Sequence, residues 1–208
     1  MGTVFEQALS DLELPEGTAQ ACHEHWKLVV AWQERVNLTS ITDLREAAWL
    51  HYRDSLEVLS QWSTDSIVDI GSGAGFPGVP LAIARPEAQV ALLEPRRKRA
   101  SFLRTVRARL NLENLTIIHG SSNDAPPRLF AAATTRATFS DTGQLSECLR
   151  WVEPGGTLIA MRSEKLPQPA AISHPYTVDG HDRFLELWTT SGPENGAEAA
   201  QAPEIGSN

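Results

Sequence analysis

Two carboxylates flank a glycine-rich stretch near the middle of the chain, in a pattern that can bind a nucleoside cofactor. Residues 67–81 read IVDIGSGAGFPGVPL, with Asp69 two residues before the first glycine, Gly71. Glu94 follows Gly71 by twenty-three residues and ends the apolar run VALLE. A carboxylate at this distance from a glycine turn accepts hydrogen bonds from both hydroxyls of a bound ribose.

The glycines themselves indicate close contact between backbone and ligand. Gly71, Gly73 and Gly75 follow residues 67–70, IVDI, at alternate positions. A turn that brings bare backbone against a ligand has no room for a Cβ and often requires a positive φ. We therefore expect these three glycines to line the cofactor site.

Two kinds of cofactor satisfy this pattern. Gly73, Gly75 and Gly78 match the G-x-G-x-x-G signature of dinucleotide sites, which is a weak signal by itself. In such sites a pyrophosphate faces the helix N-terminus, and an acid as close as Asp69 is unfavourable there. S-adenosylmethionine has a sulfonium and an ammonium group, which suit a turn lined by carboxylates. The residues favour S-adenosylmethionine and leave an NAD-dependent oxidoreductase as the alternative.

Strands and helices alternate around this loop. Apolar β-branched runs predict strands, and amphipathic stretches predict helices between them. The expected strands are 67–70, 90–94, 115–119, a weak one near 132–137, 157–161, and two closing, partly antiparallel strands at 176–179 and 184–190. Helices are expected after the loop, after Pro95 and at 145–151, with a turn at 153–156. This alternation predicts an α/β fold, a mostly parallel Rossmann-like sheet with helices on both faces.

The chain divides into three expected parts. Residues 1–62 show helical apolar stripes, with Thr42 or Asp43 as a helix cap, and no flexible linker separates them from residue 67. We expect this helical N-terminal segment to pack on a cofactor-binding domain at 63–191. Residues 192–208 are polar, acidic and poor in large apolar side chains, which predicts a disordered tail.

Positive charge is concentrated in one predicted helix. The net charge is −8, yet seven of the eighteen Lys and Arg residues fall within 96–109. A local basic surface can bind nucleic-acid phosphates whatever the charge of the whole protein. The alternative interpretation is a solvated helix face without a partner.

Cysteine content and hydropathy indicate the expected compartment. Cys22 and Cys148 are the only cysteines, and no Cys/His spacing predicts a metal site. The first residues do not show the basic stretch followed by an apolar stretch that is typical of a signal peptide. No apolar run approaches the roughly 18 residues of a membrane helix. We expect a soluble cytoplasmic protein, monomeric and without a membrane partner.

Several motifs in one collinear order carry a family resemblance. They are NLTS at 37–40, HYRDS at 51–55, VDIGSGAGFPG at 68–78, LLE at 92–94, KRASFLR at 98–104, LENL at 112–115 and TRA at 135–137. Together they resemble the bacterial 16S ribosomal RNA guanine-N7 methyltransferase family, also called the glucose-inhibited division protein B family. The resemblance implies a class I methyltransferase fold, S-adenosylmethionine as donor, and a guanosine of 16S rRNA, naked or in the small ribosomal subunit particle, as acceptor.

The resemblance also implies roles for residues around the loop. Gly71 and Phe76 would contact the donor, with Asp69 beside its amino-acid end and Glu94 on the ribose. In a second group, the backbone of Ser122 and Asn123 would hold the adenine, Arg136 would lie where donor and base meet as the catalytic residue, and His51 would line the substrate side. The expected RNA contacts are Arg53, Arg96, Arg97, Lys98 and Arg162.

The chain departs from the family pattern at three places. Ser121, Ser122 and Asn123 replace an Arg-Val-Glu run, Ala131 replaces an acid, and Arg162 replaces a lysine. A degenerate member that binds S-adenosylmethionine or RNA without turnover is therefore an alternative to an active enzyme.

The acceptor chemistry agrees with the absence of a conspicuous catalytic cluster in the sequence. Guanine N7 has a lone pair and no proton, so methylation there requires no general base. Alignment and electrostatics can suffice.

Overall fold

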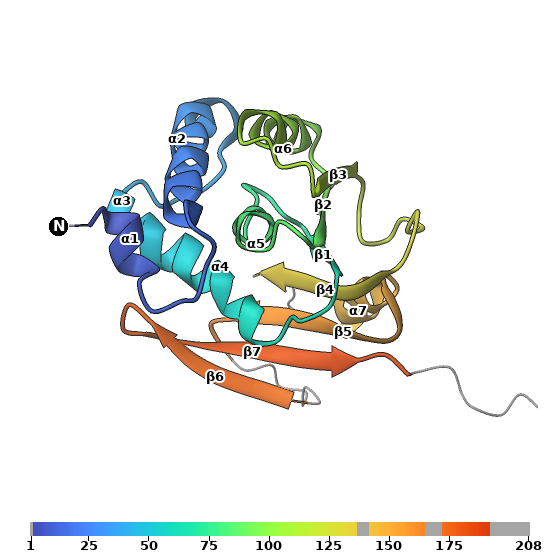
Figure 1. The fold of residues 1–208 in the computed structure, drawn as a ribbon. Helices are drawn as coiled ribbons and strands as arrows, with labels where there is room; N and C mark the ends of the chain where they lie inside the picture. The colour runs from blue at the N-terminus through green and yellow to red at the C-terminus, as the bar shows by residue number, and fades with distance from the viewer. Residues whose placement is uncertain (1, 137–141, 165–171, 192–208) are drawn as a thin grey trace, which may run out of the picture.

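A single seven-stranded sheet forms the centre of the protein. The computed structural model describes residues 2–136, 142–164 and 172–191. The strands lie in the order β3-β2-β1-β4-β5-β7-β6 (Figure 1). They are β1 (Ser66–Ile70), β2 (Gln89–Glu94), β3 (Leu115–His119), β4 (Phe130–Arg136), β5 (Val152–Arg162), β6 (Ile172–Val178) and β7 (His181–Thr189). Neighbours among β1 to β5 pair in parallel, whereas β7 pairs antiparallel with both β5 and β6. The predicted fold class, including the antiparallel closing strands, is confirmed.

Helices cover both faces of this sheet. Helices α5 (Gly78–Ala84) and α6 (Arg97–Arg109) lie on one face, where Leu81 and Phe102 pack in the same hydrophobic cluster as Ile67 of β1. Helix α7 (Thr142–Leu149) lies on the other face, in a second cluster (Figure 1). The central strands are buried from both sides, which explains their nearly continuous apolar sequence.

The N-terminal helices add to the layer that contains α5 and α6. They are α1 (Val4–Ala8), α2 (Thr18–Val36), α3 (Leu44–Ala47), the π-helix η1 (Ala48–Arg53), α4 (Asp54–Leu56) and the 3₁₀-helix η2 (Glu57–Ser60). Asp43 caps α3, since its carboxylate accepts a hydrogen bond from the Glu46 N–H at 2.8 Å. The division into 1–62 and 63–191 stays a prediction, and the predicted disordered tail, 192–208, lies outside the described residues.

Strand β5 differs most from its predicted extent. The expected turn at 153–156 lies inside β5, where the register with β4 shifts between the pairs Phe130–Val152 and Ala132–Thr157. The extra residues of β5 form a bulge. The bulge lets the strand continue through Pro and Gly residues that would otherwise end it. The helix α7 also begins and ends earlier than the predicted 145–151.

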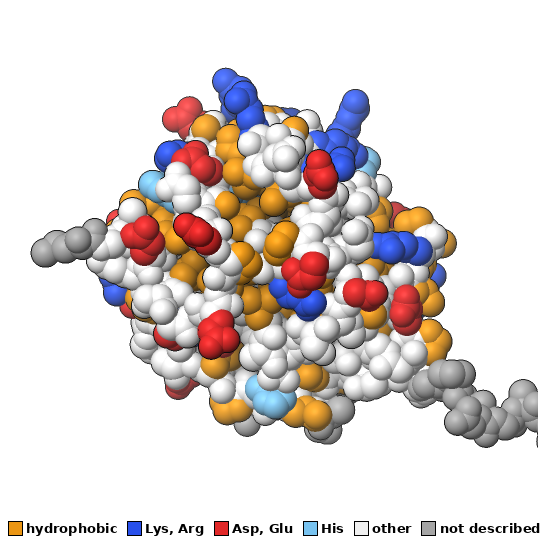
Figure 2. All heavy atoms as spheres, in the orientation of Figure 1, with side chains coloured by type: hydrophobic (Ala, Val, Ile, Leu, Met, Phe, Trp, Pro, Cys, Tyr) orange, Lys and Arg blue, Asp and Glu red, His pale blue; other side chains and the backbone are white. Residues whose placement is uncertain are grey.

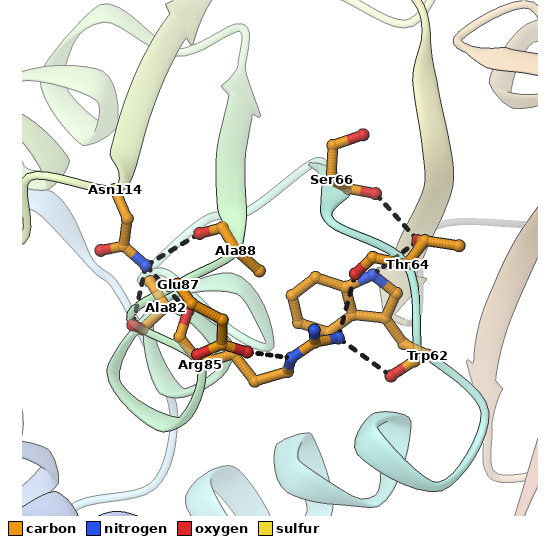
Figure 3. A network of polar contacts seen from close by, with 8 residues as sticks. All are labelled: Trp62, Thr64, Ser66, Ala82, Arg85, Glu87, Ala88 and Asn114. Atoms are coloured by element: carbon orange, nitrogen blue, oxygen red, sulfur yellow. Dashed lines mark hydrogen bonds and ion pairs between the residues drawn. The ribbon is translucent and has the colours of Figure 1, made fainter.

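Polar contacts close the amino edge of the sheet. Arg85, just after α5, stacks over the Trp62 ring at 4.4 Å and donates a hydrogen bond to the Thr64 carbonyl at 3.0 Å (Figure 3). Asn114, before β3, donates from its amide to the carbonyls of Ala82 and Ala88 at 3.0 and 3.1 Å (Figure 3). These contacts hold together the segments that connect helices and strands at the amino edge. The site lies at the carboxyl edge, as is usual in parallel sheets.

Candidate active site

The glycine loop joins β1 to α5 at the carboxyl edge of the sheet. Gly71, Gly73 and Gly75 have φ angles of 78°, 57° and 95°, which L-residues with side chains rarely adopt. The N–H groups of Gly71 and Ser72 donate to the Leu93 carbonyl at 2.9 and 3.1 Å, so the loop is fixed to the end of β2. The loop exposes backbone where the sequence predicts a cofactor.

Glu94 reaches the loop from the end of β2. Its side chain is buried, with Oε2 accepting from the Gly73 N–H at 2.8 Å and Oε1 from the Arg96 N–H at 2.7 Å. A carboxylate offers about four acceptor positions, so capacity remains for the hydroxyls of a ribose. The structure therefore brings Glu94 and the glycines together, as the spacing predicts.

Asp69 lies beneath the loop. Its Oδ2 accepts from the Gly78 N–H at 3.0 Å, and none of the described residues donates a hydrogen bond to Oδ1. Burial raises the pKa of this carboxyl to about 7. Among the described residues, Glu94 therefore accepts from a loop N–H group at the carboxyl edge, whereas Asp69 accepts from the N–H of the first residue of α5.

Two buried residues of the N-terminal segment hold the loop from the opposite side. His25 of α2 lies with Nε2 3.1 Å from the Ala74 carbonyl and Nδ1 2.9 Å from the Tyr52 hydroxyl. The carbonyl can only accept, so Nε2 carries the proton and Nδ1 accepts from Tyr52. Burial lowers the His25 pKa to about 3, which keeps the ring neutral.

His25 is not among the site residues predicted from the sequence. A signal was present, because Cys22, His25, Trp26 and Val29 follow helical spacing on one stripe of α2, and all four are buried. A histidine within such a stripe indicates a buried polar contact.

Phe76 joins the loop to the π-helix. Its ring stacks on His51 with centroids 4.5 Å apart, and the Arg136 guanidinium lies 5.1 Å from the ring centroid. The Phe76 side chain is buried in this packing, so a ligand above the loop meets mainly its backbone. The π turn in η1 aims His51 at the loop, a use of π geometry that recurs at functional sites.

Arg136, at the end of β4, contacts three parts of η1 and α4. It donates to the Leu50 carbonyl at 3.3 Å, lies 3.3 Å from His51 Nδ1, and forms an ion pair with Asp54 at 3.6 Å. Thr39 holds the other nitrogen of His51 at 2.7 Å. Burial, and then the charge of Arg136, lowers the His51 pKa to about 3, so this ring is also neutral.

A pocket of about 420 Å³ opens beside Arg136. Its lining comes from the N-terminal helices, the ends of β4 and β5, and the hairpin of β6 and β7. The lining residues are Ile41, Leu50, His51, Asp54, Arg136, Met161, Arg162, Ser163, Tyr176 and Arg183. The volume suits a ligand the size of a nucleotide. Arg136 thus belongs both to the packing around the glycine loop and to this pocket.

Ser122 and Asn123 follow β3 at the same edge. The Ser122 hydroxyl donates to Glu147 of α7 at 2.8 Å, and its carbonyl accepts from the Trp151 indole at 3.0 Å. The connection begins next to Glu94, whose carbonyl accepts from the Gly120 N–H at 3.3 Å. The segment therefore lies beside the predicted ribose position.

The residues expected to bind RNA fall into two groups. Arg96, Arg97 and Lys98 are exposed at the start of α6, and Arg162 lines the pocket. Arg53 differs from the expectation, because its largely buried guanidinium forms ion pairs with Glu57 and with Asp11. Its position in η1 turns it toward the N-terminal helices.

A basic surface extends along α6. The exposed basic side chains of this helix and its N-cap are Arg96, Arg97, Lys98, Arg104, Arg107 and Arg109. Arg99 instead donates to the Asn37 carbonyl at 2.9 Å and ties α6 to the end of α2. Figure 2 shows Lys and Arg side chains gathered at the top of the view, over α6.

Neither a metal cluster nor a membrane span is found in the part of the chain that the structure describes. Within that part, no group of three or more His, Cys, Asp or Glu side chains is placed to hold a metal ion. None of its helices combines the length and apolar character needed to cross a bilayer.

The sheet order, the glycine loop and the acid at the end of β2 define a class I methyltransferase fold. An O-methyltransferase from Bacillus cereus, solved in complex with SAH, has this fold, with a TM-score of 0.58 and 18% identity over 91% of this chain and 98% of that one. At this identity the likeness shows the fold alone.

The chain belongs to the GidB family, described as rRNA small subunit methyltransferase G, whose family model matches residues 18–175. It is 36% identical to the ribosomal RNA small subunit methyltransferase G of Alkalilimnicola ehrlichii, over 81% of this chain and 77% of that protein. The protein of the same name from Clostridium beijerinckii is also 36% identical, over 76% and 69%. The family predicted from the motifs is confirmed, and it favours a methyltransferase over the oxidoreductase alternative.

Proposed function

We propose that the protein transfers a methyl group from S-adenosylmethionine to N7 of a guanosine in 16S rRNA. One observation supports this most directly: Arg136 contacts Phe76 of the glycine loop and also lines the adjoining pocket. A donor on the loop and a base in the pocket would meet at this residue. The names of the relatives support small-subunit rRNA as the acceptor.

The loop residues fit the donor. Gly71, Gly73 and Gly75 present backbone without side chains, and Glu94 retains acceptor positions for ribose hydroxyls. The connection after β3, with Ser122 and Asn123, would hold the adenine. Bound S-adenosylmethionine supplies a methyl group activated by its sulfonium.

The chain's own residues would align the reaction and exclude water. The N7 lone pair forms the new N–C bond while the C–S bond breaks, and the electrons of the C–S bond go to sulfur. Because N7 bears no proton, the transfer moves none. This fits a site in which His51 and His25 are held neutral and Arg136 is fixed by Asp54 and Leu50. Such a site accelerates transfer by orientation and electrostatics, without a general base.

The exposed start of α6 would contact RNA phosphates. Arg96, Arg97 and Lys98 follow Glu94 after one proline, and the Arg96 N–H donates to the Glu94 carboxylate, so they would border the predicted donor position. Arg162 would add a contact at the pocket. We further propose that the protein acts in the cytoplasm as a monomer, on 16S rRNA or the small-subunit particle.

The test is methyl transfer followed by nucleoside mapping. Purified protein and S-adenosylmethionine are incubated with small ribosomal subunits, or with 16S rRNA, lacking the modification. We expect 7-methylguanosine at one position. Binding of S-adenosylmethionine without any transfer to either substrate would identify a degenerate family member instead.

A further inference from the structure

The pocket beside Arg136 contains a buried carboxylate, that of Asp54. Asp54 is only 5% exposed, yet it lines the pocket. Its Oδ1 accepts from the Tyr176 hydroxyl at 2.8 Å, and its Oδ2 lies 3.6 Å from the Arg136 guanidinium. These two contacts leave acceptor positions on both oxygens.

The remaining walls suit a flat base with a phosphate attached. Ile41, Leu50 and Met161 contribute apolar surface, whereas Arg162 and Arg183 contribute positive charge. A nucleotide combines an apolar ring face with an anionic backbone, and bases taken out of a stack are bound in this way, by contacts on their faces and on their Watson–Crick edges.

The C-terminal hairpin fixes the polar part of this pocket. Tyr176 of β6 and Arg183 of β7 are cross-strand partners, which places them on the same face of the hairpin. Arg45 of α3 forms a two-contact ion pair with Asp179 at the hairpin turn, at 2.8 and 3.0 Å. The hairpin is thereby tied to the N-terminal helices that carry Asp54.

We propose that Asp54, oriented by Tyr176, is the specificity-determining residue that binds the Watson–Crick edge of the acceptor guanine, while Arg183 contacts its phosphate. This inference rests on the proposed function and names the recognition element of the same site. Guanine has two donors on that edge, N1–H and the N2 amine, and a carboxylate accepts both. Adenine has an acceptor at N1, which a carboxylate repels.

The position of N7 agrees with this assignment. N7 lies on the Hoogsteen edge, away from N1 and N2 on the Watson–Crick edge, so a carboxylate on N1 and N2 leaves N7 free to face the donor. Methylation also places positive charge on the base. Bonds from N1–H and the N2 amine to a carboxylate therefore strengthen in the transition state, which raises the transfer rate.

The test compares two RNAs after the target guanosine has been mapped. One RNA keeps this guanosine, and the other carries inosine at the same position, introduced by splinted ligation. Both RNAs are assembled into small subunits. Inosine keeps N7 and N1–H but lacks the N2 amine. We expect the wild-type kcat/KM to be about 10- to 100-fold higher for guanosine, the worth of one hydrogen bond to a charged group. In Asp54→Asn this ratio should fall toward one.

Further variants separate recognition from support. Tyr176→Phe should lower the guanosine-to-inosine ratio less than Asp54→Asn does. Arg183→Gln should raise KM on both RNAs without changing the ratio. The matched control is Arg150→Gln, an exposed arginine at the amino edge of the sheet, which should match the wild type.

Two results would overturn the inference while the proposed function stands. The first is equal wild-type activity on guanosine and inosine, a measurement that needs no variant. The second is an equal loss on both RNAs in Asp54→Asn, which would mean that Asp54 only holds Arg136. Absence of transfer to guanosine by the wild type would instead refute the proposed function.

Discussion

The Glu94 carboxylate accepts two hydrogen bonds without a ligand, one from the loop N–H of Gly73 and one from the N–H of Arg96, the N-cap residue of α6. Substitution of Glu94 should therefore weaken donor binding by more than the loss of the ribose contact alone would. Asp69 differs from Glu94, because it is buried and its Oδ2 accepts from the Gly78 N–H at the start of α5, and its predicted place in the donor site stays a prediction.

The Glu94→Ala variant should weaken S-adenosylmethionine binding by about 1 to 3 kcal/mol, because hydrogen bonds to a charged acceptor are lost. Isothermal titration calorimetry measures the change. Glu87→Ala is the matched control, since Glu87 is exposed and pairs with Arg85 at the opposite edge of the sheet. Unchanged donor affinity in Glu94→Ala would refute the ribose role.

Gly78 begins α5 where there is no space for a side chain. A Cβ there would lie 2.2 Å from Leu92 Cδ2 and 2.8 Å from Asp69 Oδ2. We expect Gly78→Ala to lower the free energy of unfolding by about 1 to 3 kcal/mol, the usual cost of overpacking. Urea denaturation measures it.

The control for Gly78→Ala is Gly180→Asn. Gly180 has open space around it and a φ of 75°, which Asn tolerates. This surface change should alter the free energy of unfolding by less than about 0.5 kcal/mol. Equal effects of the two variants would contradict the steric explanation.

At the scale of elements, α6 has two faces with different tasks. Phe102, Leu103 and Val106 pack against the sheet, while the arginines and the lysine face solvent. The start of the helix lies beside Glu94 at the carboxyl edge of the sheet, and its end lies toward the amino edge. The basic side chains at the start of α6 therefore lie closer to the site than those at its end.

We expect Arg97→Ala with Lys98→Ala to lower RNA affinity and to reduce the slope of log K against log[salt] by about 1.5, since two phosphate contacts are lost. Donor binding should not change. Filter binding across a salt series measures the slope.

The same charge removal at the other end of α6, Arg107→Ala with Arg109→Ala, is the matched control and should have a smaller effect. An unaltered salt slope in Arg97→Ala with Lys98→Ala would make this end of the helix a solvated face.

At the scale of the whole molecule, the N-terminal helices, the glycine loop and the hairpin form one connected structure. His25 links α2 to the loop, and Asp54 links α4 to the hairpin through Tyr176. Because these links are buried and polar, stability depends on their protonation states.

The free energy of unfolding should decrease in acid through His25. Its pKa is about 3 in the folded protein and about 6.5 when unfolded, so as pH falls the unfolded chain binds the proton first. Stability is therefore lost below about pH 6.5, by about 1.4 kcal/mol per pH unit for this group.

The variant His25→Gln isolates this contribution. It keeps a side-chain donor for the Ala74 carbonyl but takes up no proton, so its stability should fall about 1.4 kcal/mol less per pH unit between about pH 6 and pH 4. His51, and Asp69 with its opposing raised pKa of about 7, are present in both proteins. Parallel stability curves from urea denaturation would contradict the assignment.

The sequence alone determined the sheet, the glycine loop, the partnership of Glu94 with that loop, and the family. These follow from local patterns, since apolar periodicity, glycine spacing and contiguous motifs all lie within short stretches of chain. The bulge inside β5 escaped prediction because Pro154 and Gly155 are turn signals, and only pairing with β4 overrides them.

Only the tertiary structure decided which polar groups meet. Asp69 faces inward, Arg53 pairs with acids of the N-terminal segment, and His25 supports the loop. The pocket assembles η1, β4, β5 and the C-terminal hairpin, with Asp54 and Tyr176 separated by 122 residues along the chain. The direction of a side chain and its partner depend on packing between distant segments, which no local pattern contains.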